Sequence, residues 1–430
     1  MKALRAALEA VQKRQQALER KEAVRQAAAA SAPAAGPLLA VKSPFATAHP
    51  GYLQIPGSNT LIKIGGYVKV DGVYDVKGSF NGTAATFGDI PLEGTAASKR
   101  NPNFSATARE SRFNIATLTP TELGELKTFI EGDFYGAGGN AEQSNSYGFR
   151  LRQAYFEVGP WLAGQAWTTF ADLETVPETL EFNGPSGFPI ARQALVRYTT
   201  ALGPGALSLA FENPSSDAQY THAVWPDSIG TNFAPEGVVR WKADPSWGHV
   251  AVAGLAREIS ADTGGPNIFG ITGKSSTFGW GVLGAIGFNT IGKDRLSFQG
   301  IVGEGIGRYF NNGADDNYQG ASVNLDGSVR ATPAFGVTAS YKHYWNDWVR
   351  STVAYGHTEY DNELPRDQLN SIRSIDSVHA NLLFNPFVNT TVGVEYVFGH
   401  IKKDAFDPAT GATGPDGWAH RIQTSAIVNF

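Results

Sequence analysis

The segment Leu61-Ile-Lys-Ile-Gly-Gly-Tyr-Val-Lys-Val-Asp-Gly-Val-Tyr-Asp75 decides how the rest of the chain is interpreted. Its even positions are apolar, namely Ile62, Ile64, Val68, Val70 and Tyr74, and its odd positions include Lys63, Lys69, Asp71 and Asp75. Side chains of a β-strand alternate between the two faces of a sheet. A strand of this length with one apolar and one charged face is expected to separate an apolar environment from water. A strand in the core of a β-sandwich does not do this.

The same alternation recurs along the chain. It predicts about sixteen strands, near 61–75, 109–119, 125–135, 149–158, 161–170, 190–201, 205–212, 237–243, 248–259, 277–289, 294–304, 334–345, 348–359, 374–384, 387–400 and 418–430. Any one of these segments is compatible with a half-buried strand of a soluble sheet. Sixteen together favour a closed barrel, because lipid offers no hydrogen-bond partner to an open sheet edge.

The connections alternate between short and long. The short turns are 119–124, 159–160, 202–204, 244–248, 290–293, 346–347 and 385–386. The long loops are about 76–108, 136–148, 171–189, 213–236, 260–276, 305–333, 360–373 and 401–417. Short turns at one end and long loops at the other are typical of transmembrane β-barrels of the bacterial outer membrane, whose short turns are periplasmic. We therefore expect an all-β, 16-stranded antiparallel transmembrane β-barrel over residues 59–430.

The last strand supports this fold independently. Apolar and small side chains alternate in it as far as the final residue, at Ile422, Thr424, Ala426, Val428 and Phe430. A chain that ends on an aromatic residue of such a strand looks like an outer-membrane protein. An even number of strands places both ends of the barrel on the periplasmic side.

Residues 1–30 differ from everything that follows. Leu4, Leu8, Val11, Gln15 and Leu18 follow a 4-3-4-3 spacing, which predicts a short α-helical coiled coil with one polar layer at Gln15. A frayed, solvated helix is the alternative, since isolated helices of this length are marginal in water. Residues 31–58 are interpreted as a linker, because Pro33 and Pro37 end the helix. The coiled coil would lie in the periplasm.

Composition excludes several other classes of protein. Only 17% of the 430 residues are charged, and 49 are glycine. The chain has no cysteine, which excludes disulfides and thiolate metal sites. The net charge of −5 gives no indication of nucleic-acid binding. We expect no cofactor and no metal; a loose calcium-like pattern from Asp315 to Asp326 lacks the twelfth-position glutamate of a calcium loop.

Strand parity assigns side chains to lipid or lumen. The lipid-facing aromatic residues are predicted to be Tyr74, Phe134, Tyr155, Tyr198, Trp241, Trp280, Tyr355, Tyr396 and Phe430. The basic residues predicted to face the lumen are Lys63, Lys69, Arg112, Lys127, Arg150, Arg152, Arg197, Arg240, Lys242, Arg295, Lys342, Arg350 and Arg421. The acids are Asp71, Asp75, Glu131, Asp133, Glu212, Glu258 and Glu395. Thirteen bases against seven acids predict a preference for anions, unless the arginines pair with the acids and only stiffen the wall.

The third long loop is the least ordinary of the loops. It carries four acids and no base, at Asp172, Glu174, Glu178 and Glu181. In outer-membrane channels the third loop commonly folds into the lumen and sets the constriction. These acids would then oppose the arginines across the pore. If they face outward, they leave the anion path free.

Several motifs resemble the DcaP-like outer-membrane porins. They are Ile62-Lys-Ile-Gly-Gly-Tyr-Val-Lys-Val-Asp71, Arg109-Glu-Ser-Arg-Phe113, Leu126-Lys-Thr-Phe-Ile-Glu-Gly-Asp-Phe-Tyr135, Leu151-Arg-Gln-Ala-Tyr155 and Gly164-Gln-Ala-Trp-Thr-Thr-Phe170. The resemblance implies a homotrimer of sixteen-stranded barrels tied together by a periplasmic coiled coil. It also implies uptake of small anionic solutes such as dicarboxylates.

The sequence therefore predicts a non-enzymatic diffusion channel in the outer membrane of a Gram-negative bacterium. Its expected partners are two further copies of the chain, outer-membrane lipid and lipopolysaccharide, and small anionic solutes. Two alternatives stay open. One is a barrel that anchors a periplasmic coiled coil, and the other is an outer-membrane hydrolase.

Overall fold

The computed structural model describes residues 49–99, 102–140, 143–219, 229–267, 269–311, 319–324, 326–362, 371–404 and 415–430. The chain divides into a first unit, Met1–Gln54, and a second unit, Ile55–Phe430. Within the first unit, the described residues include the two-residue strand β1 (Leu53–Gln54). The predicted coiled coil with Leu4, Leu8, Val11, Gln15 and Leu18, and most of the predicted linker, lie outside the described residues.

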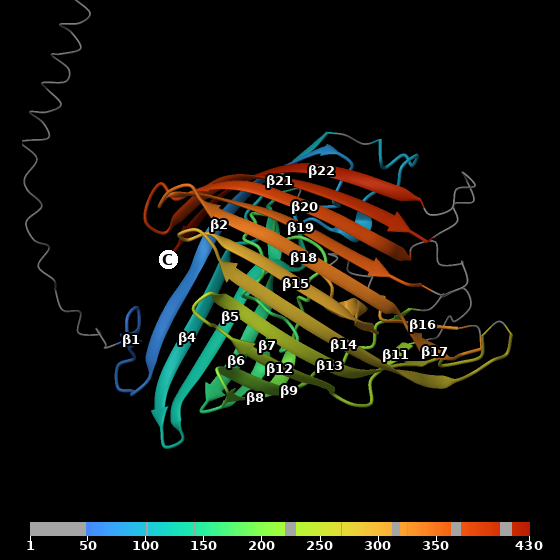
Figure 1. Ribbon diagram of the computed structural model, residues 1–430, viewed down its shortest axis with the longest axis horizontal. Coiled ribbons are helices and arrows are strands. Elements are labelled where there is room, and N and C mark those ends of the chain that lie inside the picture. Colours follow the sequence, from blue (N-terminus) through green and yellow to red (C-terminus); the bar gives the residue numbers. More distant parts are fainter. Residues whose placement is uncertain are drawn as a thin grey trace, which may run out of the picture. The chain divides into compact units, whose positions relative to one another are not determined.

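Sixteen strands of the second unit form one antiparallel sheet, which Figure 1 shows curving around a central space. They are β2 (Leu61–Lys77), β4 (Arg112–Thr121), β5 (Gly124–Asn140), β6 (Ser146–Val158), β7 (Trp161–Trp167), β8 (Arg192–Leu202), β9 (Gly205–Glu212), β12 (Glu236–Ala243), β13 (Gly248–Asp262), β14 (Lys274–Asn289), β15 (Arg295–Glu304), β18 (Pro333–Tyr344), β19 (Val349–Tyr360), β20 (Ile372–Phe384), β21 (Thr390–Lys403) and β22 (Asp416–Asn429).

The barrel closes between its first and last strands. β2 pairs antiparallel with β22, in a register that places Val70 opposite Ala426 and Tyr74 opposite Ile422. The backbone N–H of Phe430 donates to the carbonyl oxygen of Gly66 at 3.1 Å. This closure removes the sheet edges, and the predicted 16-stranded antiparallel barrel is confirmed.

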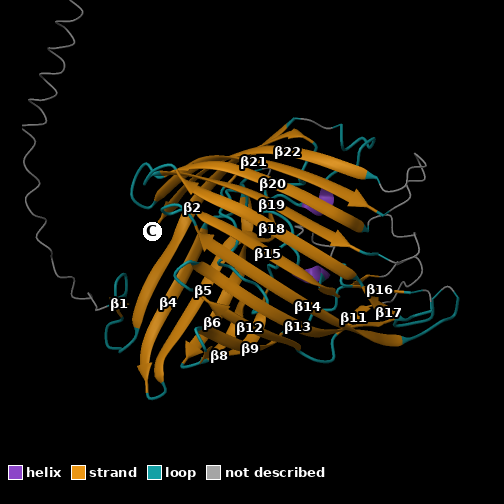
Figure 2. Cartoon of the chain, viewed as in Figure 1, coloured by secondary structure: helices purple, strands orange, loops and turns teal. Residues whose placement is uncertain are grey.

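The smaller elements lie in the long loops and beside the wall. They are β3 (Asn103–Thr107), β10 (Ala218–Gln219), β11 (Ile229–Thr231), β16 (Ala321–Val323), β17 (Val329–Ala331) and two single-turn 3-10 helices, η1 (Phe87–Asp89) and η2 (Gly307–Tyr309). Figure 2 shows how little helix the barrel carries. Within the described ranges, no helix is long and apolar enough to cross a membrane.

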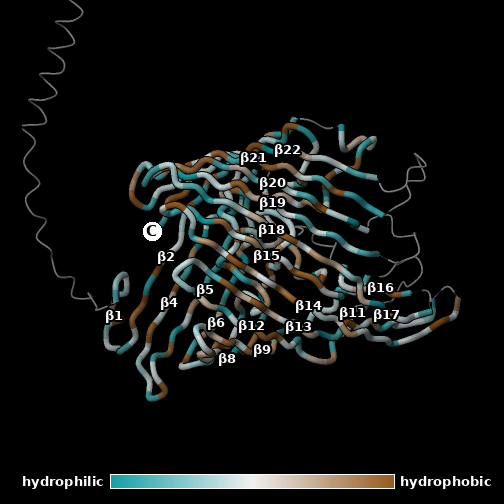
Figure 3. Tube along the Cα trace, in the orientation of Figure 1, coloured by the Kyte–Doolittle hydropathy of each residue, from teal (hydrophilic) through white to brown (hydrophobic). Residues whose placement is uncertain are grey.

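Hydropathy alternates along each strand (Figure 3), as the period of two requires. On β2, Ile64, Val68 and Val70 are more than half exposed on the outer face. Lys69 and Asp75 on the same strand are almost fully buried on the inner face. The outer face is thus the apolar one, which is the arrangement that a lipid environment requires.

Two predictions from strand parity are wrong. A register shift in the β5–β6 pairing, between Glu131 and Gly132, leaves Arg152 as an extra residue on β6. A bulge of this kind reverses the faces of the residues that follow, so Tyr155 faces the lumen opposite Phe129 instead of the lipid. On β13 the buried inner positions are odd-numbered, which places Arg257 in the lumen and Glu258 on the outer face.

Some loop boundaries also differ from the expectation. The second loop is short, because β5 extends to Asn140 and β6 begins at Ser146. The first loop is interrupted by β3, which pairs with the loop end of β2 beyond the β2–β4 pairing. These differences arise because glycine-rich or polar strand ends continue a ladder of backbone hydrogen bonds that does not depend on side-chain alternation.

Candidate functional site

The third loop (residues 168–191) contacts strands that are not its neighbours in the sheet. The carbonyl oxygen of Leu180 accepts hydrogen bonds from Lys69 Nζ on β2 at 2.6 Å and from Gln423 Nε2 on β22 at 2.9 Å. The backbone N–H of Ser186 donates to Ser377 Oγ on β20 at 2.9 Å. A loop that begins at β7 and bonds to β2, β20 and β22 crosses the interior of the barrel.

Three of the four acids of the third loop have partners. Asp172 hydrogen-bonds His249 of β13 at 2.9 Å and accepts from Thr175 Oγ1 at 2.8 Å. Glu181 accepts from the backbone N–H groups of Ala85 and of two residues of its own loop. The side chain of Glu174 is exposed, and the described residues include no ion-pair partner for it.

Glu178 is the acid that the third loop presents to the basic side of the wall. Its carboxylate accepts from Arg350 Nε at 2.9 Å and Nη2 at 2.6 Å, and lies 3.2 Å from Lys342 Nζ. Although burial opposes ionisation, the hydrogen bond from Arg350 and the charge of Lys342 hold the pKa of Glu178 below its ordinary value. Arg350, Lys342 and Glu178 therefore form a compact group with one net positive charge.

The first loop, described over residues 78–99, also enters the barrel, which was not among the predictions from the sequence. Phe80, Phe87 and Ile90 are buried, and the rings of Phe80 and Phe87 lie 5.5 Å apart, edge to face. Arg421 of β22 donates to the carbonyl oxygen of Gly82 at 2.6 Å and pairs with Asp75 at 2.7 Å. The sequence feature that could have suggested an inward course is the set of large apolar residues in this loop, Phe80, Phe87 and Ile90.

The basic residues of β4 and β6 pair with acids of β5. Arg150 binds both oxygens of Asp133, at 3.0 and 2.8 Å, and Arg152 binds Asp133 and Glu131 at 2.8 and 2.9 Å. Arg112 lies 3.8 Å from Glu131. The guanidinium of Arg152 also lies 5.6 Å from the ring of Phe182 at the inner part of the third loop. The group holds three bases against two acids.

Lys69 is enclosed by acids on its own side of the wall. It pairs with Glu110, which precedes β4, and lies 3.5 Å from Asp71. Only 1% of its side chain is exposed. Its charge is therefore compensated locally and is withdrawn from the lumen.

Lys63 and Lys127 lie toward the short-turn ends of β2 and β5. Both side chains are exposed. Lys127 Nζ lies 3.9 Å from Glu125, a separation at which an exposed ion pair contributes little. These two residues are at the mouth of the barrel and far from the third-loop contacts of their strands.

Arg197, Arg240, Lys242 and Arg295 differ from the other predicted lumen bases. Within the described part of the chain, none of the four has a carboxylate at ion-pair distance. Arg197 of β8 and Arg240 and Lys242 of β12 line one cavity of about 230 Å³ beside the root of the third loop. Arg295 of β15 has two buried guanidinium nitrogens without a hydrogen-bond partner among the described residues. The uncompensated positive charge is thus concentrated on the β8–β15 side of the wall.

Known outer-membrane proteins are similar to this chain in sequence and in architecture. Residues 47–213 match the family model described as DcaP outer membrane protein. The chain is 23% identical to the porin Omp2b of Brucella suis over 341 residues, which cover 70% of this chain and 82% of that porin. The crystal structure of the outer membrane channel DcaP of Acinetobacter baumannii matches with a TM-score of 0.73 and 20% identity, covering 88% of this chain and 99% of that one. The chain is an outer-membrane porin that is similar to the DcaP channels.

The fold of this porin is shared with more distant proteins. The trimer form of OmpT of Vibrio cholerae matches with a TM-score of 0.51 at 10% identity, covering 87% of this chain and all of that chain (100%). The similar proteins are porins and channels, so the chain is a channel protein of the Gram-negative outer membrane rather than an enzyme.

The porin has a further charged cluster that strand patterns did not reveal. Arg257 of β13 pairs with Asp217 at 2.9 Å and with Glu236 at 2.8 Å, and Arg308 of η2 pairs with Glu236 at 2.9 Å. The hydroxyl of Tyr309 donates to the same Glu236. Arg308 and Asp217 belong to long loops, whose inward course could not be deduced from alternation.

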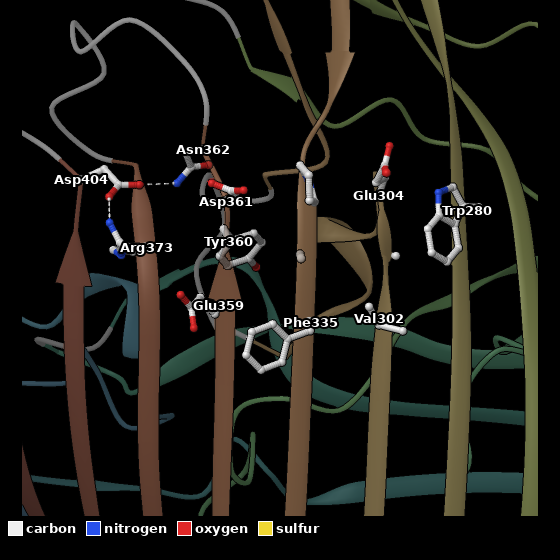
Figure 4. Close-up of a pocket in the computed structure, with 13 residues that line it drawn as sticks. Trp280, Val302, Glu304, Phe335, Glu359, Tyr360, Asp361, Asn362, Arg373 and Asp404 are labelled. Atoms are coloured by element: carbon white, nitrogen blue, oxygen red, sulfur yellow. Dashed lines mark hydrogen bonds and ion pairs between the residues drawn. The ribbon is translucent and has the colours of Figure 1, made fainter.

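Acidic side chains also gather on the outer rim of the porin, at the loop ends of β15, β19 and β21. Figure 4 shows Glu304, Glu359, Asp361 and Asp404 in a cavity of about 550 Å³ above Val302 and Phe335. Arg373 pairs with Asp404 at 3.4 Å, and Asn362 donates to Asp404 at 2.9 Å. In the part of the chain that is described, no group of side chains is suited to hold a metal ion.

Proposed function

We propose that this porin is a passive diffusion channel that prefers small anionic solutes, dicarboxylates among them. The observation that carries the proposal is a set of four lumen bases, Arg197, Arg240, Lys242 and Arg295, that have no carboxylate at ion-pair distance within the described residues. A cation that is already paired adds little to the field in the pore. An unpaired guanidinium can replace part of the hydration shell of a passing carboxylate and bind it through two parallel hydrogen bonds.

The third loop is proposed to set the constriction. It holds Leu180 against β2 and β22 and Glu178 against Arg350, so a solute has to pass beside it. Two of its four acids, Asp172 and Glu178, are bound to basic or imidazole groups, which limits their repulsion of anions. The free path then runs between this loop and the unpaired bases of β8, β12 and β15.

Ion selectivity tests the proposal directly. In planar bilayers under a potassium chloride gradient, the purified porin is expected to give a reversal potential whose sign shows that chloride permeates more readily than potassium. Arg240→Gln should move that potential toward zero, because the substitution removes an uncompensated charge from the path. Lys127→Gln, an exposed lysine at the mouth, is the matched control and should change it less. Cation selectivity of the unsubstituted porin would overturn the proposal.

A homotrimer tied by a periplasmic coiled coil over residues 1–30 is proposed as the assembly. Similarity to a trimeric porin fold supports the trimer. Sedimentation of the full chain in detergent is expected to give three copies, and deletion of residues 1–36 should weaken the trimer while conductance is retained. Loss of all channel activity on this deletion would instead favour the anchor alternative.

A further inference from the structure

A small cavity beside the root of the third loop joins an apolar wall to a basic one. Tyr155 of β6, Leu162 of β7 and Leu173 of the third loop contribute apolar groups to its lining. Arg197, which lies opposite Leu162 in the β7–β8 pairing, and Arg240 and Lys242 of β12 contribute positive charges. The cavity measures about 230 Å³, below the range of about 300–1,000 Å³ for sites that hold drug-sized ligands. A pocket of this size suits a compact solute.

The apolar wall is unusual for the inside of a water-filled barrel. Leu162 and Leu195 are 5% and 4% exposed, and with Ala166 they form a separate cluster against which Tyr155 packs. The ring of Tyr155 lies 5.6 Å from that of Phe129. Tyr155 reaches this side only because the bulge at Arg152 reverses the faces of β6. Tyr155 is the partly buried member of this cluster, so its ring supplies most of the apolar surface that this wall presents.

The basic side chains of the cavity form no ion pairs with carboxylates within the described residues. Arg240 Nη1 donates to the carbonyl oxygen of Ala171 at 2.7 Å, which fixes the guanidinium against the loop. Arg197 and Lys242 have no carboxylate at ion-pair distance within the described residues.

The neighbouring acids are mostly engaged by other groups. Asp172 is bound by His249 and Thr175. Glu212 accepts from Thr168 Oγ1 at 2.6 Å and from Gln193 Nε2 at 2.5 Å. Glu174 also lines the cavity, and its side chain is exposed. Among the residues that line the cavity, the three bases outnumber the two acids, Asp172 and Glu174, by one positive charge.

We propose that this cavity is a subsite for organic monocarboxylates that carry a compact apolar body, such as an aromatic or alicyclic ring. The carboxylate would bind Arg197 and Lys242 beside Arg240, and the ring would lie on Tyr155, Leu162 and Leu173. The inference rests on the proposed anion channel and adds the solute class of one site within it. A second carboxylate on the same small solute would have to lie on the apolar wall, where it loses hydration without a partner.

Block of the chloride current measures binding at this subsite. Benzoate and cyclohexanecarboxylate, added to single channels of the full-length porin, should block at concentrations about tenfold lower than acetate or succinate, because an apolar contact worth one or two methylene groups changes affinity by at least that factor. Leu173→Ser should reduce the advantage of the ring compounds several-fold and leave block by succinate unchanged. Leu123→Ser, at a leucine 81% exposed in a short turn, is the matched control and should have no effect.

The outcomes separate this inference from the proposed function. Chloride selectivity with equal block by benzoate and acetate overturns the subsite and leaves the anion channel intact. Cation selectivity overturns both. Leu173 is 45% exposed, so the substitution leaves the barrel folded; heat-modifiable migration on a gel verifies this. A Tyr155→Ser variant gives a second reading from the opposite strand, and unchanged ring-compound block in both variants contradicts the proposal.

Discussion

Asp133 shows how a lumen side chain can be charged without contributing to the field in the pore. Its two oxygens accept from Arg150 and Arg152, and its side chain is fully buried. Removing one partner of such a buried group costs several kcal/mol, although the intact pair contributes little net stability. Counting lumen bases by strand parity therefore overstates the positive charge that a solute meets. The relevant residues are those that lack such partners.

Asp294, in the short turn before β15, carries a pH dependence of stability. It accepts from the backbone N–H of Tyr344 at 2.8 Å and hydrogen-bonds the side chains of His343 and Tyr341. These hydrogen bonds lower its pKa from 3.8 to about 2. Because the pKa is lowered in the folded state, the ionised carboxylate stabilises the folded barrel above about pH 3.8. This stabilisation is lost as the pH falls through about 2.

Asp294→Asn should consequently lower the thermal unfolding temperature at pH 5 and have a smaller effect near pH 2, because there the carboxyl is already protonated in the unfolded chain and about half protonated in the folded barrel. Thermal unfolding in detergent at the two pH values measures this. Asp347→Asn is the comparison and should have a smaller effect, because the carboxylate of Asp347 is exposed and pairs with the exposed Lys293. Equal destabilisation of Asp294→Asn at both pH values would contradict the prediction.

At the level of elements, the third loop is held by contacts that only its backbone geometry permits. Gly187 has a φ of +92°, and a Cβ there would lie 2.4 Å from the carbonyl oxygens of Val337 and His357. Glycine is the residue that accepts both the positive φ and this approach. The segment around Ser186 can therefore lie directly on β18 and β19.

Gly187→Ala should push this segment away from the wall and toward the pore axis. We expect lower single-channel conductance, with a loss of about 1–3 kcal/mol of unfolding free energy from overpacking. Gly184→Ala is the matched control: its φ is +68°, but the nearest atom to its Cβ would be 3.6 Å away. Conductance recordings of the two variants decide the matter, and equal values would show that the contact at Gly187 does not shape the pore.

At the level of the whole molecule, the described part of the barrel is a single sheet whose outer face is mainly apolar. Val353, near the middle of β19, is 55% exposed between Tyr341 and Ala380. Val349 begins the same strand at its short-turn end. If the outer face lies in lipid, a charge costs most near the bilayer centre and little at the interface.

Val353→Arg should therefore destabilise the barrel folded in lipid vesicles by about 2–4 kcal/mol, and Val349→Arg should destabilise it by about 0–1 kcal/mol. Denaturant titration of the folded fraction in vesicles gives both values. A similar cost at the two depths would argue against a membrane-spanning orientation of β19.

Most of the barrel could be predicted because each strand carries its own signal. The segments near 205–212 and 334–345, and the closing strand that ends at Phe430, appear where alternation placed them. The errors have local causes. The face of Tyr155 was wrong because a bulge inserts one residue and reverses the period, and the inward first loop was missed because loops carry no period.

The amino-acid sequence by itself determined that this chain is a closed transmembrane barrel, because lipid outside and water inside impose a period of two on every strand. Only the tertiary structure decided which lumen charges are paired. Partners such as Arg350 and Glu178 are 172 residues apart in the sequence. They meet because a loop folds across the lumen, and a local sequence pattern cannot predict that course.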